Sequence, residues 1–228
     1  MYAKYWKRAI DFILSLIALI VLSPILLVLT VVGAIVMKGN PFFTQLRPGK
    51  DEKIFKLVKF RTMTCEKDKD GKLLPDEKRL TKYGKLLRST SLDELPELWN
   101  IVKGDMSIVG PRPQLVRDMV FMSEEQRRRH SVRQGLTGLA QISGRNNMTW
   151  EQKLEYDLYY IKNITFLGDF KIILGTFVKV FQRDGIATEG METSEDYGDY
   201  LLRIKKVLQS EYDECQKKAV ELLGNSNK

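Results

Sequence analysis

The sequence predicts a mostly α-helical fold with a small β element and an apolar segment near the N-terminus that enters a membrane. No charged residue lies between Phe12 and Met37. Several later segments repeat apolar residues at helical spacing. One short segment, Ile54 to Phe60 (IFKLVKF), has the composition of a strand.

Composition limits the classes of protein to which the chain can belong. Its 228 residues suffice for one principal domain with a core, and a hydrophobic content of 43% argues against disorder. The formal net charge of +8 indicates an anionic partner, namely nucleic acid, lipid head groups or phosphorylated small molecules. The apolar segment favours the last two. Cys65 and Cys215 lack the spacing of metal ligands, so we expect free thiols of a reducing compartment.

The uncharged segment is longer, as a helix, than the hydrocarbon core of a bilayer is thick. Its 26 residues would span roughly 39 Å as a straight helix, more than the roughly 30 Å hydrocarbon core. No small-residue cleavage site follows it, so we expect it to be retained rather than removed as a signal peptide. Pro24, at its middle, lacks a backbone donor and clashes with the preceding turn, which predicts a break in the helix. We expect Ser23 to satisfy a carbonyl that this break frees.

Positive charge flanks the segment on both sides. Lysine and arginine precede it at three positions and follow it at four: Lys4, Lys7, Arg8, Lys38, Arg47, Lys50 and Lys53. The flank of a membrane span that is richer in lysine and arginine usually lies in the cytoplasm. Here both flanks are positive, so this rule does not favour either orientation of a helix that crosses the membrane once. A re-entrant helix-break-helix over residues 1–38 places both flanks in the cytoplasm. A kinked spanning helix remains the alternative, because prolines also occur in spanning helices.

The segments after the strand are expected to alternate between turns, loops and helices. Asp70-Gly71 predicts a turn. Ser91 to Val102 has apolar residues at helical spacing, and Ser91-x-x-Glu94 resembles a capping box. Pro96 is tolerated because it falls near the first turn of that helix. Asp93 and Glu94 are therefore expected at a helix N-terminus.

Two glycine- and proline-rich segments, Gly104 to Pro113 and Gln134 to Arg145, are expected to be loops. A cluster of arginines around His130 lies between them, at positions Arg127, Arg128, Arg129 and Arg133.

Trp150 to Thr165 and Asp169 to Arg183 predict two more helices. The second has a stripe of apolar residues, which suits either a membrane interface or a soluble core: Phe170, Ile173, Leu174, Phe177, Val178 and Phe181. From Ala187 the chain is acidic and polar, then helix-like to Leu223, and forms either an appendage or a contact surface.

Asp93-Glu94 is the pair of residues with the clearest chemical potential. Acidic residues at a helix start usually just complement the helix dipole. Here the surroundings are basic, with Arg88 nearby and Pro111-Arg112-Pro113 downstream, and an arginine held between prolines suits bidentate phosphate binding. An ionised carboxylate in such a place can attack phosphorus and form an acyl phosphate. Hard oxygen ligands would hold Mg²⁺ beside it. A structural or surface role, rather than catalysis, is expected for His130.

The chain resembles the bacterial sugar transferase family, the small monotopic phosphoglycosyl transferases. The resemblance covers about Lys7 to Gly185 and is specific because its motifs occur in the order of the family. They are Lys7-Arg8-x-x-Asp11, Ser23-Pro24, FTQLRPG (Phe43 to Gly49), KFRTM (Lys59 to Met63), SLDELPELWN (Ser91 to Asn100), GDMSIVGPRP (Gly104 to Pro113) and GLTGLAQISGR (Gly135 to Arg145). It is closest to the single-domain members that start glycoconjugate assembly.

This resemblance implies a location, an architecture and a reaction. Family members lie on the cytoplasmic face of the bacterial inner membrane, with a re-entrant helix and interfacial amphipathic helices. It implies a catalytic domain at 39–185, while the tail at 186–228 has no counterpart. A nucleotide sugar, here a UDP-sugar, gives its sugar-1-phosphate to polyprenyl (undecaprenyl) phosphate, and a nucleoside monophosphate leaves.

The resemblance also assigns residues. Asp93 is the nucleophile that attacks the β-phosphate, Glu94 is its acid/base or metal-supporting partner, and both stand at a Mg²⁺ or Mn²⁺ ion. Arg112, between Pro111 and Pro113, contacts the nucleotide or its phosphates. Further candidates at the site are Lys59, Arg88, Arg145 and Asp157.

Two other functions fit parts of the sequence. A membrane-anchored scaffold would use basic patches to hold anionic lipid or nucleic acid, but Arg127 to Arg133 lacks the interleaved aromatics of a single-strand platform, so no nucleic acid is expected. A nucleotide-sugar hydrolase would use water as acceptor. No motif encodes the donor sugar, the glycan pathway or the oligomeric state, a homo-oligomer included.

We predict that the N-terminus and Lys38 both lie in the cytoplasm, because a re-entrant hairpin returns to the face from which it enters. Cysteine-accessibility labelling in intact cells tests this: a cysteine at either position should be protected from an impermeant reagent outside. A periplasmic N-terminus would contradict the hairpin and favour a single span.

Overall fold

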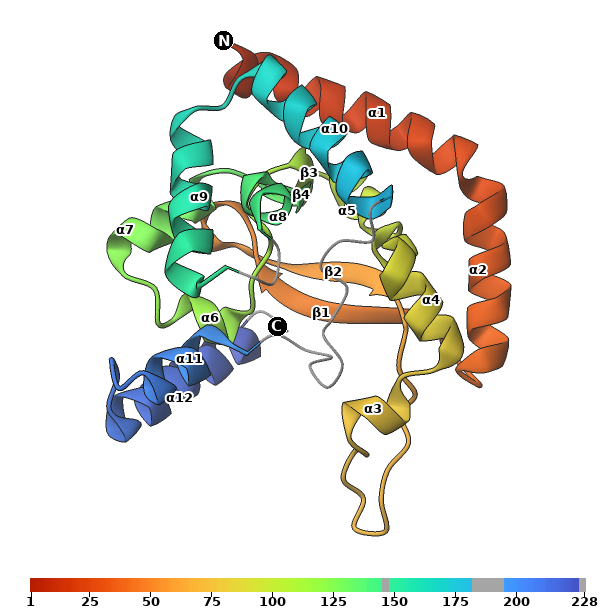
Figure 1. The fold of residues 1–228 in the computed structure, drawn as a ribbon, viewed down its shortest axis with the longest axis vertical. Coiled ribbons are helices and arrows are strands. Elements are labelled where there is room, and N and C mark those ends of the chain that lie inside the picture. Colours follow the sequence, from red (N-terminus) through yellow and green to blue (C-terminus); the bar gives the residue numbers. More distant parts are fainter. Residues whose placement is uncertain (145–147, 182–194, 226–228) are drawn as a thin grey trace.

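The computed structural model describes residues 1–144, 148–181 and 195–225, with helices arranged around two small sheets (Figure 1). The strands are β1 (Phe42–Pro48), β2 (Ile54–Phe60), β3 (Met106–Val109) and β4 (Gln134–Thr137). The α-helices are α1 (Lys7–Val21), α2 (Ser23–Val36), α3 (Asp76–Arg79), α4 (Lys82–Thr90), α5 (Glu97–Lys103), α6 (Val116–Met119), α7 (Glu124–Arg127), α8 (Leu139–Ser143), α9 (Trp150–Lys162), α10 (Phe166–Phe181), α11 (Tyr197–Arg203) and α12 (Gln209–Asn225). A π-helical turn, η1 (Tyr2–Trp6), and three 3-10 turns, η2 (Lys50–Glu52), η3 (Leu92–Glu94) and η4 (Arg128–Ser131), complete the chain. The predicted mostly helical fold with a small β element is confirmed.

The apolar N-terminal segment is broken where the sequence predicts. Helices α1 and α2 meet at Leu22 with a bend of 64°. Pro24 has no N–H to donate to the carbonyl of Ile20, and the Ser23 hydroxyl donates to that carbonyl instead, at 2.7 Å. Within the described residues no helix is by itself long and apolar enough to cross a bilayer, and this bent pair meets the criteria of length and composition only when its two helices are taken together.

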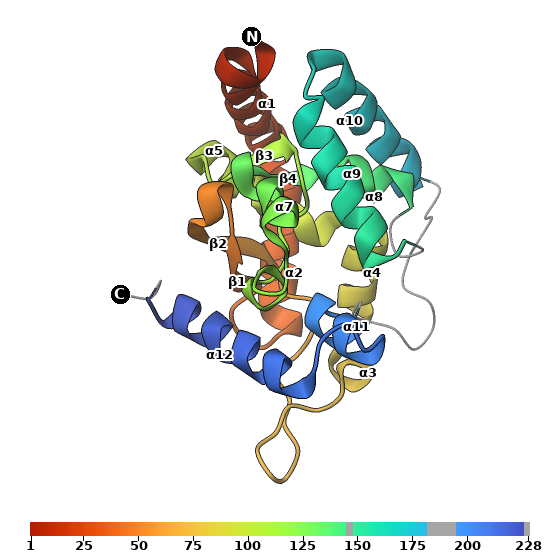
Figure 2. The same ribbon diagram turned by 90° about the vertical axis from the view of Figure 1, so that its left-hand side faces the viewer.

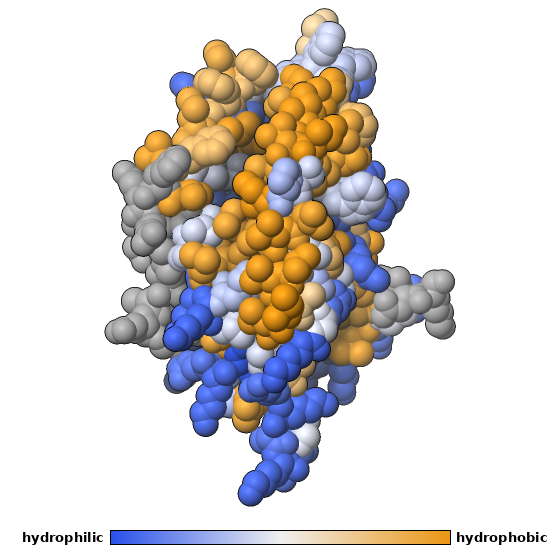
Figure 3. Space-filling view, turned by 90° about the vertical axis from the view of Figure 1, so that its right-hand side faces the viewer, coloured by the Kyte–Doolittle hydropathy of each residue, from blue (hydrophilic) through white to orange (hydrophobic). Residues whose placement is uncertain are grey.

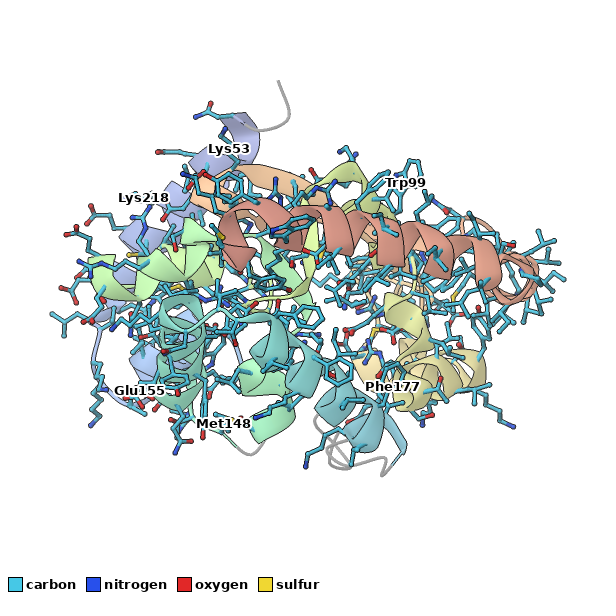
Figure 4. All side chains as sticks on the ribbon, turned by 90° about the horizontal axis from the view of Figure 1, so that it is seen from above. Lys53, Trp99, Met148, Glu155, Phe177 and Lys218 are labelled. Carbon is cyan, nitrogen blue, oxygen red and sulfur yellow. The ribbon has the colours of Figure 1, made fainter. Side chains whose placement is uncertain are left out.

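The outer face of the bent pair is apolar and uncovered. Figure 3 shows it as a continuous hydrophobic band running along α1 and α2. The exposed side chains include Ile13, Leu14, Ile17, Ile20, Val21, Ile25, Leu27, Val28, Val31 and Ile35. Trp99 of α5 and Phe177 of α10, each 59% exposed, lie on opposite sides of α1 in Figure 4 and extend this surface.

The polar residues at the start of α1 fasten it to the rest of the protein. Arg8 donates from Nη1 and Nη2 to the carbonyls of Ile101 and Val102, at 2.6 and 2.9 Å. These carbonyls belong to the last turn of α5, where the carbonyl of Ile101 also accepts from Gly104 N at 3.0 Å. Asp11 accepts from the Ser107 hydroxyl of β3 at 2.6 Å. This α1 anchor therefore binds both α5 and β3.

A second part of the α1 anchor reaches α9 and α10. Lys7 Nζ lies 2.6 Å from Asp169 Oδ2, and the hydroxyl of Tyr2 donates to the same oxygen at 2.8 Å. The hydroxyl of Tyr160 donates to the other oxygen, also at 2.8 Å. Asp169 is buried, so this closed network satisfies a charge that would otherwise be costly.

The larger sheet is the antiparallel hairpin β1–β2, paired from Phe42 opposite Phe60 to Pro48 opposite Ile54. The predicted strand has the bounds of β2. Helix α5 lies on this hairpin and is locked to it by Asn100, which accepts from Val58 N at 3.1 Å and donates to Lys56 O at 2.8 Å.

The prediction of loops at Gly104 to Pro113 and Gln134 to Arg145 is wrong in part. These segments contain the parallel strands β3 and β4 and helix α8. Their glycines indicated loops, but they serve close packing. A Cβ on Gly135 would lie 2.1 Å from the backbone nitrogen of Gly110, so two backbones touch there. Such short, buried, glycine-bounded strands have no alternating pattern to reveal them.

Two arginines of the cluster around His130, Arg127 and Arg129, form ion pairs with other parts of the fold. Arg129 is fully buried and donates to Asp157 from Nε and Nη2 at 2.9 and 2.7 Å. The carboxylate of Asp157, a candidate for the site, is thus held in an internal ion pair. Arg127 pairs with Glu52. His130 is buried, which lowers its pKa to about 3, so it is neutral and structural as expected.

The predicted helices at Trp150 to Thr165 and Asp169 to Arg183 correspond to α9 and α10. On α10, Ile172 is buried in a core cluster and Ile173 packs against it. Four other residues of the predicted stripe have exposed side chains, namely Phe170, Leu174, Phe177 and Val178. Arg145, Arg183, Gly185 and Ala187 lie outside the described residues.

Candidate active site

A cavity of about 870 Å³ opens between the β1–β2 hairpin, the end of α4 and the loop after β3. It brings together most of the predicted site residues, although they come from distant parts of the chain. The charged side chains at its wall include Lys59, Arg88, Asp93, Glu94, Glu97 and Arg112. We refer to it as the polar cavity.

Local backbone geometry sets Asp93 and Glu94 at the wall of this cavity. Ser91 ends α4 in the left-handed region, with φ of 55°, and the acidic pair follows in the 3-10 turn η3. Helix α5 starts only after Pro96. The predicted helix from Ser91 with a capping box is therefore wrong, because a residue in that conformation cannot act as the usual extended N-cap.

Glu94 is held by two cations. Its Oε1 lies 2.7 Å from Lys59 Nζ and 2.9 Å from Arg112 Nη2. Burial alone would raise the pKa of Glu94, but Lys59 and Arg112 outweigh it and hold the pKa well below its usual range. Glu94 is therefore ionised at neutral pH and keeps both cations in place.

Asp93 differs from its neighbour because no described residue donates a hydrogen bond to its carboxylate. Burial and the negative charge of Glu94 raise its pKa to about 6, against the opposing effect of Lys59, Arg112 and Arg88. It is still mostly ionised at pH 7, yet poorly stabilised. A bare carboxylate at a cavity wall is available to a ligand or as a nucleophile.

Glu97 is a third carboxylate that the sequence argument missed. It is 3% exposed and lies 3.0 Å from Lys59 Nζ, so Lys59 is shared between Glu94 and Glu97. Burial and Glu94 raise the pKa of Glu97 to about 7. The sequence offered one signal for Glu97: it follows Asp93 by four positions and Glu94 by three, and residues at these spacings share one face of a helix.

Two other arginines bind the backbone carbonyls of the loop that carries Arg112. Arg129 Nη2 donates to the carbonyl of Arg112 at 2.6 Å, and Arg47 Nη1 donates to the carbonyl of Pro113 at 3.1 Å. Pro111 is buried and accepts from Gly135 N at 2.8 Å. The guanidinium of Arg112 thus projects from a rigid backbone.

Arg88 reaches the polar cavity from α4. Its Nε donates to the Thr62 hydroxyl at 3.1 Å. The helix approaches this closely because of Gly84, where a Cβ would lie 2.0 Å from Thr62 O. The structure thus gathers Lys59, Arg88 and Arg112 around the carboxylates, while Arg145 lies outside the described residues.

A divalent cation fits the chemistry of this wall. Within the described residues no group of three or more carboxylate, thiol or imidazole side chains is arranged to hold a metal ion. Mg²⁺ at phosphate sites usually takes one or two carboxylates and completes its shell with water and substrate phosphates. The bare Asp93 carboxylate suits that role, whereas Glu94 already contacts Lys59 and Arg112.

A second cavity, of about 630 Å³, lies on the other side of Glu94 and Arg112. We call it the apolar cavity. Its wall is largely hydrophobic and comes from the end of α1, from α5, α8 and α10, with Ala18, Leu22, Leu95, Leu98, Ile108, Leu136, Ile142, Ile173 and Phe177 among its residues. It adjoins the helices whose outer faces are exposed and apolar.

Comparison with known proteins identifies relatives. Residues 2–183 match the model of a family described as bacterial sugar transferase. The uncharacterized sugar transferase EpsL of Bacillus subtilis (strain 168) is 46% identical over 192 residues, covering 84% of this chain and 95% of that protein.

Two further relatives have names that state a reaction. A UDP-glucose:undecaprenyl-phosphate glucose-1-phosphate transferase of Klebsiella pneumoniae is 44% identical over 77% of this chain. An undecaprenyl-phosphate galactose phosphotransferase of Salmonella typhimurium (strain LT2) is 34% identical over 80% of it. The matches cover 40% and 42% of these two proteins, so the chain spans about two fifths of their length.

We predict that Glu97→Gln stabilises the protein at pH 8. Burial raises the pKa of Glu97 from its usual 4.5 to about 7 in the folded state. Between these two values the folded protein keeps a proton that the unfolded protein has lost, so the free energy of unfolding falls as the pH rises from 4.5 to 7. Removing the charge should raise the free energy of unfolding at pH 8 by roughly 1–3 kcal/mol. Thermal unfolding in detergent measures this.

Two controls accompany that measurement. At pH 4.5 the wild type is already protonated at this position, so the variant should match it. Glu221→Gln, at an exposed position of α12, should change nothing at either pH. A Glu97→Gln variant that is less stable than the wild type at pH 8 would contradict the prediction.

Proposed function

The chain belongs to the bacterial sugar transferase family and is a phosphoglycosyl transferase, and we propose that it transfers a sugar-1-phosphate from a UDP-sugar to undecaprenyl phosphate through a covalent intermediate on Asp93. The products are a polyprenyl-diphosphate sugar and UMP. This is the first membrane step in the synthesis of a capsule, exopolysaccharide, O-antigen or glycoprotein glycan. The observation that carries the proposal is the bare carboxylate of Asp93 in the wall of the polar cavity, next to Glu94, which with Arg112 lines both the polar and the apolar cavity.

The proposed reaction has two displacements at one phosphorus. A carboxylate oxygen of Asp93 attacks the β-phosphorus of the donor, the bond to the bridging oxygen breaks, and UMP leaves with the bonding electrons. A phosphate oxygen of the acceptor then attacks the same phosphorus, and the acyl phosphate bond breaks. The Asp93 carboxylate is restored, and the atoms balance without any redox partner.

The neighbouring side chains prepare Asp93 and its phosphate target. Lys59 and Arg112 supply positive charge where the diphosphate is bound, and Glu94 keeps both in position. The depressed pKa of Glu94 argues against a role as proton donor at neutral pH and favours this supporting role. Asp93 would hold Mg²⁺ or Mn²⁺, which would supply positive charge against the diphosphate.

The two cavities suit two different substrates. The polar cavity, with its cations, suits the nucleotide sugar, and the apolar cavity suits the polyprenyl chain. Glu94 and Arg112 border both, so an acceptor phosphate at the inner end of the apolar cavity meets the site where the donor phosphate is bound. One nucleophile can then serve both half-reactions in turn.

We propose that α1 and α2 form a re-entrant hairpin in the inner leaflet of the bacterial plasma membrane, with the catalytic residues on the cytoplasmic face. Two arms of about 22 Å, bent by 64° and tilted equally, would reach roughly 12 Å into the hydrocarbon, short of its midplane. The exposed apolar stripe of α10 would then lie in the interface beside them. Lys4 and Lys38, which are exposed at the two ends of the pair, would meet anionic head groups.

We predict that Asp93→Asn abolishes turnover, because the amide keeps the shape of the side chain but removes the nucleophile. Loss of such a group typically lowers the rate by several orders of magnitude. Release of UMP from UDP-sugars in the presence of undecaprenyl phosphate measures it. Wild-type protein given donor without acceptor should yield a phosphosugar adduct on the peptide that contains Asp93, detected by mass spectrometry.

Glu94→Gln is the matched control for the nucleophile assignment. It should impair turnover because Lys59 and Arg112 lose their shared partner, while the adduct should still form on Asp93. An adduct on another residue, or near-normal turnover of Asp93→Asn, would show the assignment to be wrong.

Removal of divalent cations should stop the reaction. We predict that excess EDTA lowers UMP release to background and that Mg²⁺ or Mn²⁺ restores it, because the carboxylates and the diphosphate repel each other without a bridging cation. Undiminished turnover in excess EDTA would rule out the metal requirement.

A further inference from the structure

Residues 195–225, which follow the part of the chain matched by the family, pack against the rest of the fold and contribute to the wall of the polar cavity. Helices α11 and α12 lie against α6, beside one end of α9 (Figure 2). Tyr197 and Leu201 are buried in one cluster with Trp150, and Ala219 is buried against Val116. The sequence alone left open whether this segment was an appendage or a contact surface, and it is a contact surface.

Hydrogen bonds join this segment to both sides of the cavity mouth. Asp118 accepts from Leu115 N at 3.0 Å and from Tyr197 N at 2.9 Å, which ties α11 to the loop that follows Arg112. Trp150 Nε1 donates to the carbonyl of Glu195 at 3.1 Å. The backbone on either side of Asp196 is therefore fixed.

Asp196 is the residue that this fixed segment contributes to the wall of the polar cavity. It lies there with Gln114, Trp150 and Asp118. Both oxygens of Asp118 are used by backbone N–H groups. Asp196 instead pairs with Arg117, which is half-exposed and does not line the cavity.

Lys59, Arg88 and Arg112 gather at the catalytic carboxylates. Asp196 comes from a different element of the wall, with the positive charges of Arg47 and Arg117 near it. A nucleotide sugar has the complementary pattern, with an anionic diphosphate at its centre and neutral rings rich in hydroxyls at its ends. A carboxylate accepts hydrogen bonds from hydroxyls and repels phosphate.

We propose that residues 195–225 complete the donor site and that Asp196 determines donor specificity by accepting a hydrogen bond from a ring hydroxyl of the bound nucleotide sugar. The hydroxyl belongs either to the transferred sugar or to the ribose. This inference rests on the proposed function, because it takes a nucleotide sugar as the donor.

Steady-state kinetics of Asp196→Asn test the inference, with UMP release read against donor and acceptor concentrations. Loss of a hydrogen bond to a charged group should raise the KM for the donor by roughly 10-fold to 100-fold and leave the KM for undecaprenyl phosphate unchanged. Inhibition by UMP identifies the hydroxyl: unchanged inhibition points to the transferred sugar, and equally weakened inhibition points to the ribose. Both results support the proposal.

Two matched variants separate recognition from support of the fold. Arg117→Gln removes the ion-pair partner outside the cavity, and Asp199→Asn removes an acidic group on the same helix that does not line the cavity. Both should keep the donor KM of the wild type. An unchanged donor KM in Asp196→Asn, an equal rise in Arg117→Gln, or a parallel rise in the acceptor KM would overturn the proposal.

The same assay distinguishes failure of this inference from failure of the proposed function. A wild-type protein that makes no polyprenyl-diphosphate sugar from any UDP-sugar would refute the function. An active wild type with an unaltered Asp196→Asn variant would refute only the role of Asp196.

Discussion

The α1 anchor is the constraint on which the rest of the structure depends. An apolar helix with an uncovered outer face has little reason to hold one orientation, but Lys7, Arg8 and Asp11 fix it through short, largely buried contacts. Because a buried charge is tolerated only when it is paired, these contacts allow one register. Arg8 binds the end of α5, whose other end follows Asp93 and Glu94, and Asp11 binds β3, which leads to Arg112. The membrane-facing helix and both sides of the active site are thus positioned together.

The carboxylates at the polar cavity lower the stability of the folded protein but leave Asp93 free to react. Three carboxylates compete for Lys59 and Arg112, and Glu94 obtains both contacts. Asp93 and Glu97 therefore have raised pKa values, which means that the folded protein is destabilised by their ionised forms. Such local conflict is expected where a site needs an unsatisfied nucleophile, since natural proteins depart from favourable pairing mainly at functional sites.

The parts of the fold predicted from sequence are those with strong local causes. Proline dictated the break at Pro24, with the Ser23 hydroxyl on the freed carbonyl, and β2 has the bounds of its apolar run. The grouping of Lys59 and Arg112 around the acidic pair followed from the family motifs, and that of Arg88 from its closeness in the sequence. What could not be predicted depends on contacts between distant segments. The strands β3 and β4 exist because Gly110 and Gly135 meet, Ser91 takes a left-handed conformation that its sequence does not demand, and the arginines near His130 find partners inside the protein.

Asp118 makes the shape of the active-site loop and the docking of the C-terminal helices a single cooperative unit. One of its oxygens binds the backbone just after the loop of Arg112, and the other binds the first residue of α11. Detachment of α11 would therefore leave a buried carboxylate oxygen without its partner and loosen the loop as well. In hydrogen exchange, the amides of Leu115 and Tyr197 would belong to one unit of local unfolding, although 82 positions separate them in the chain.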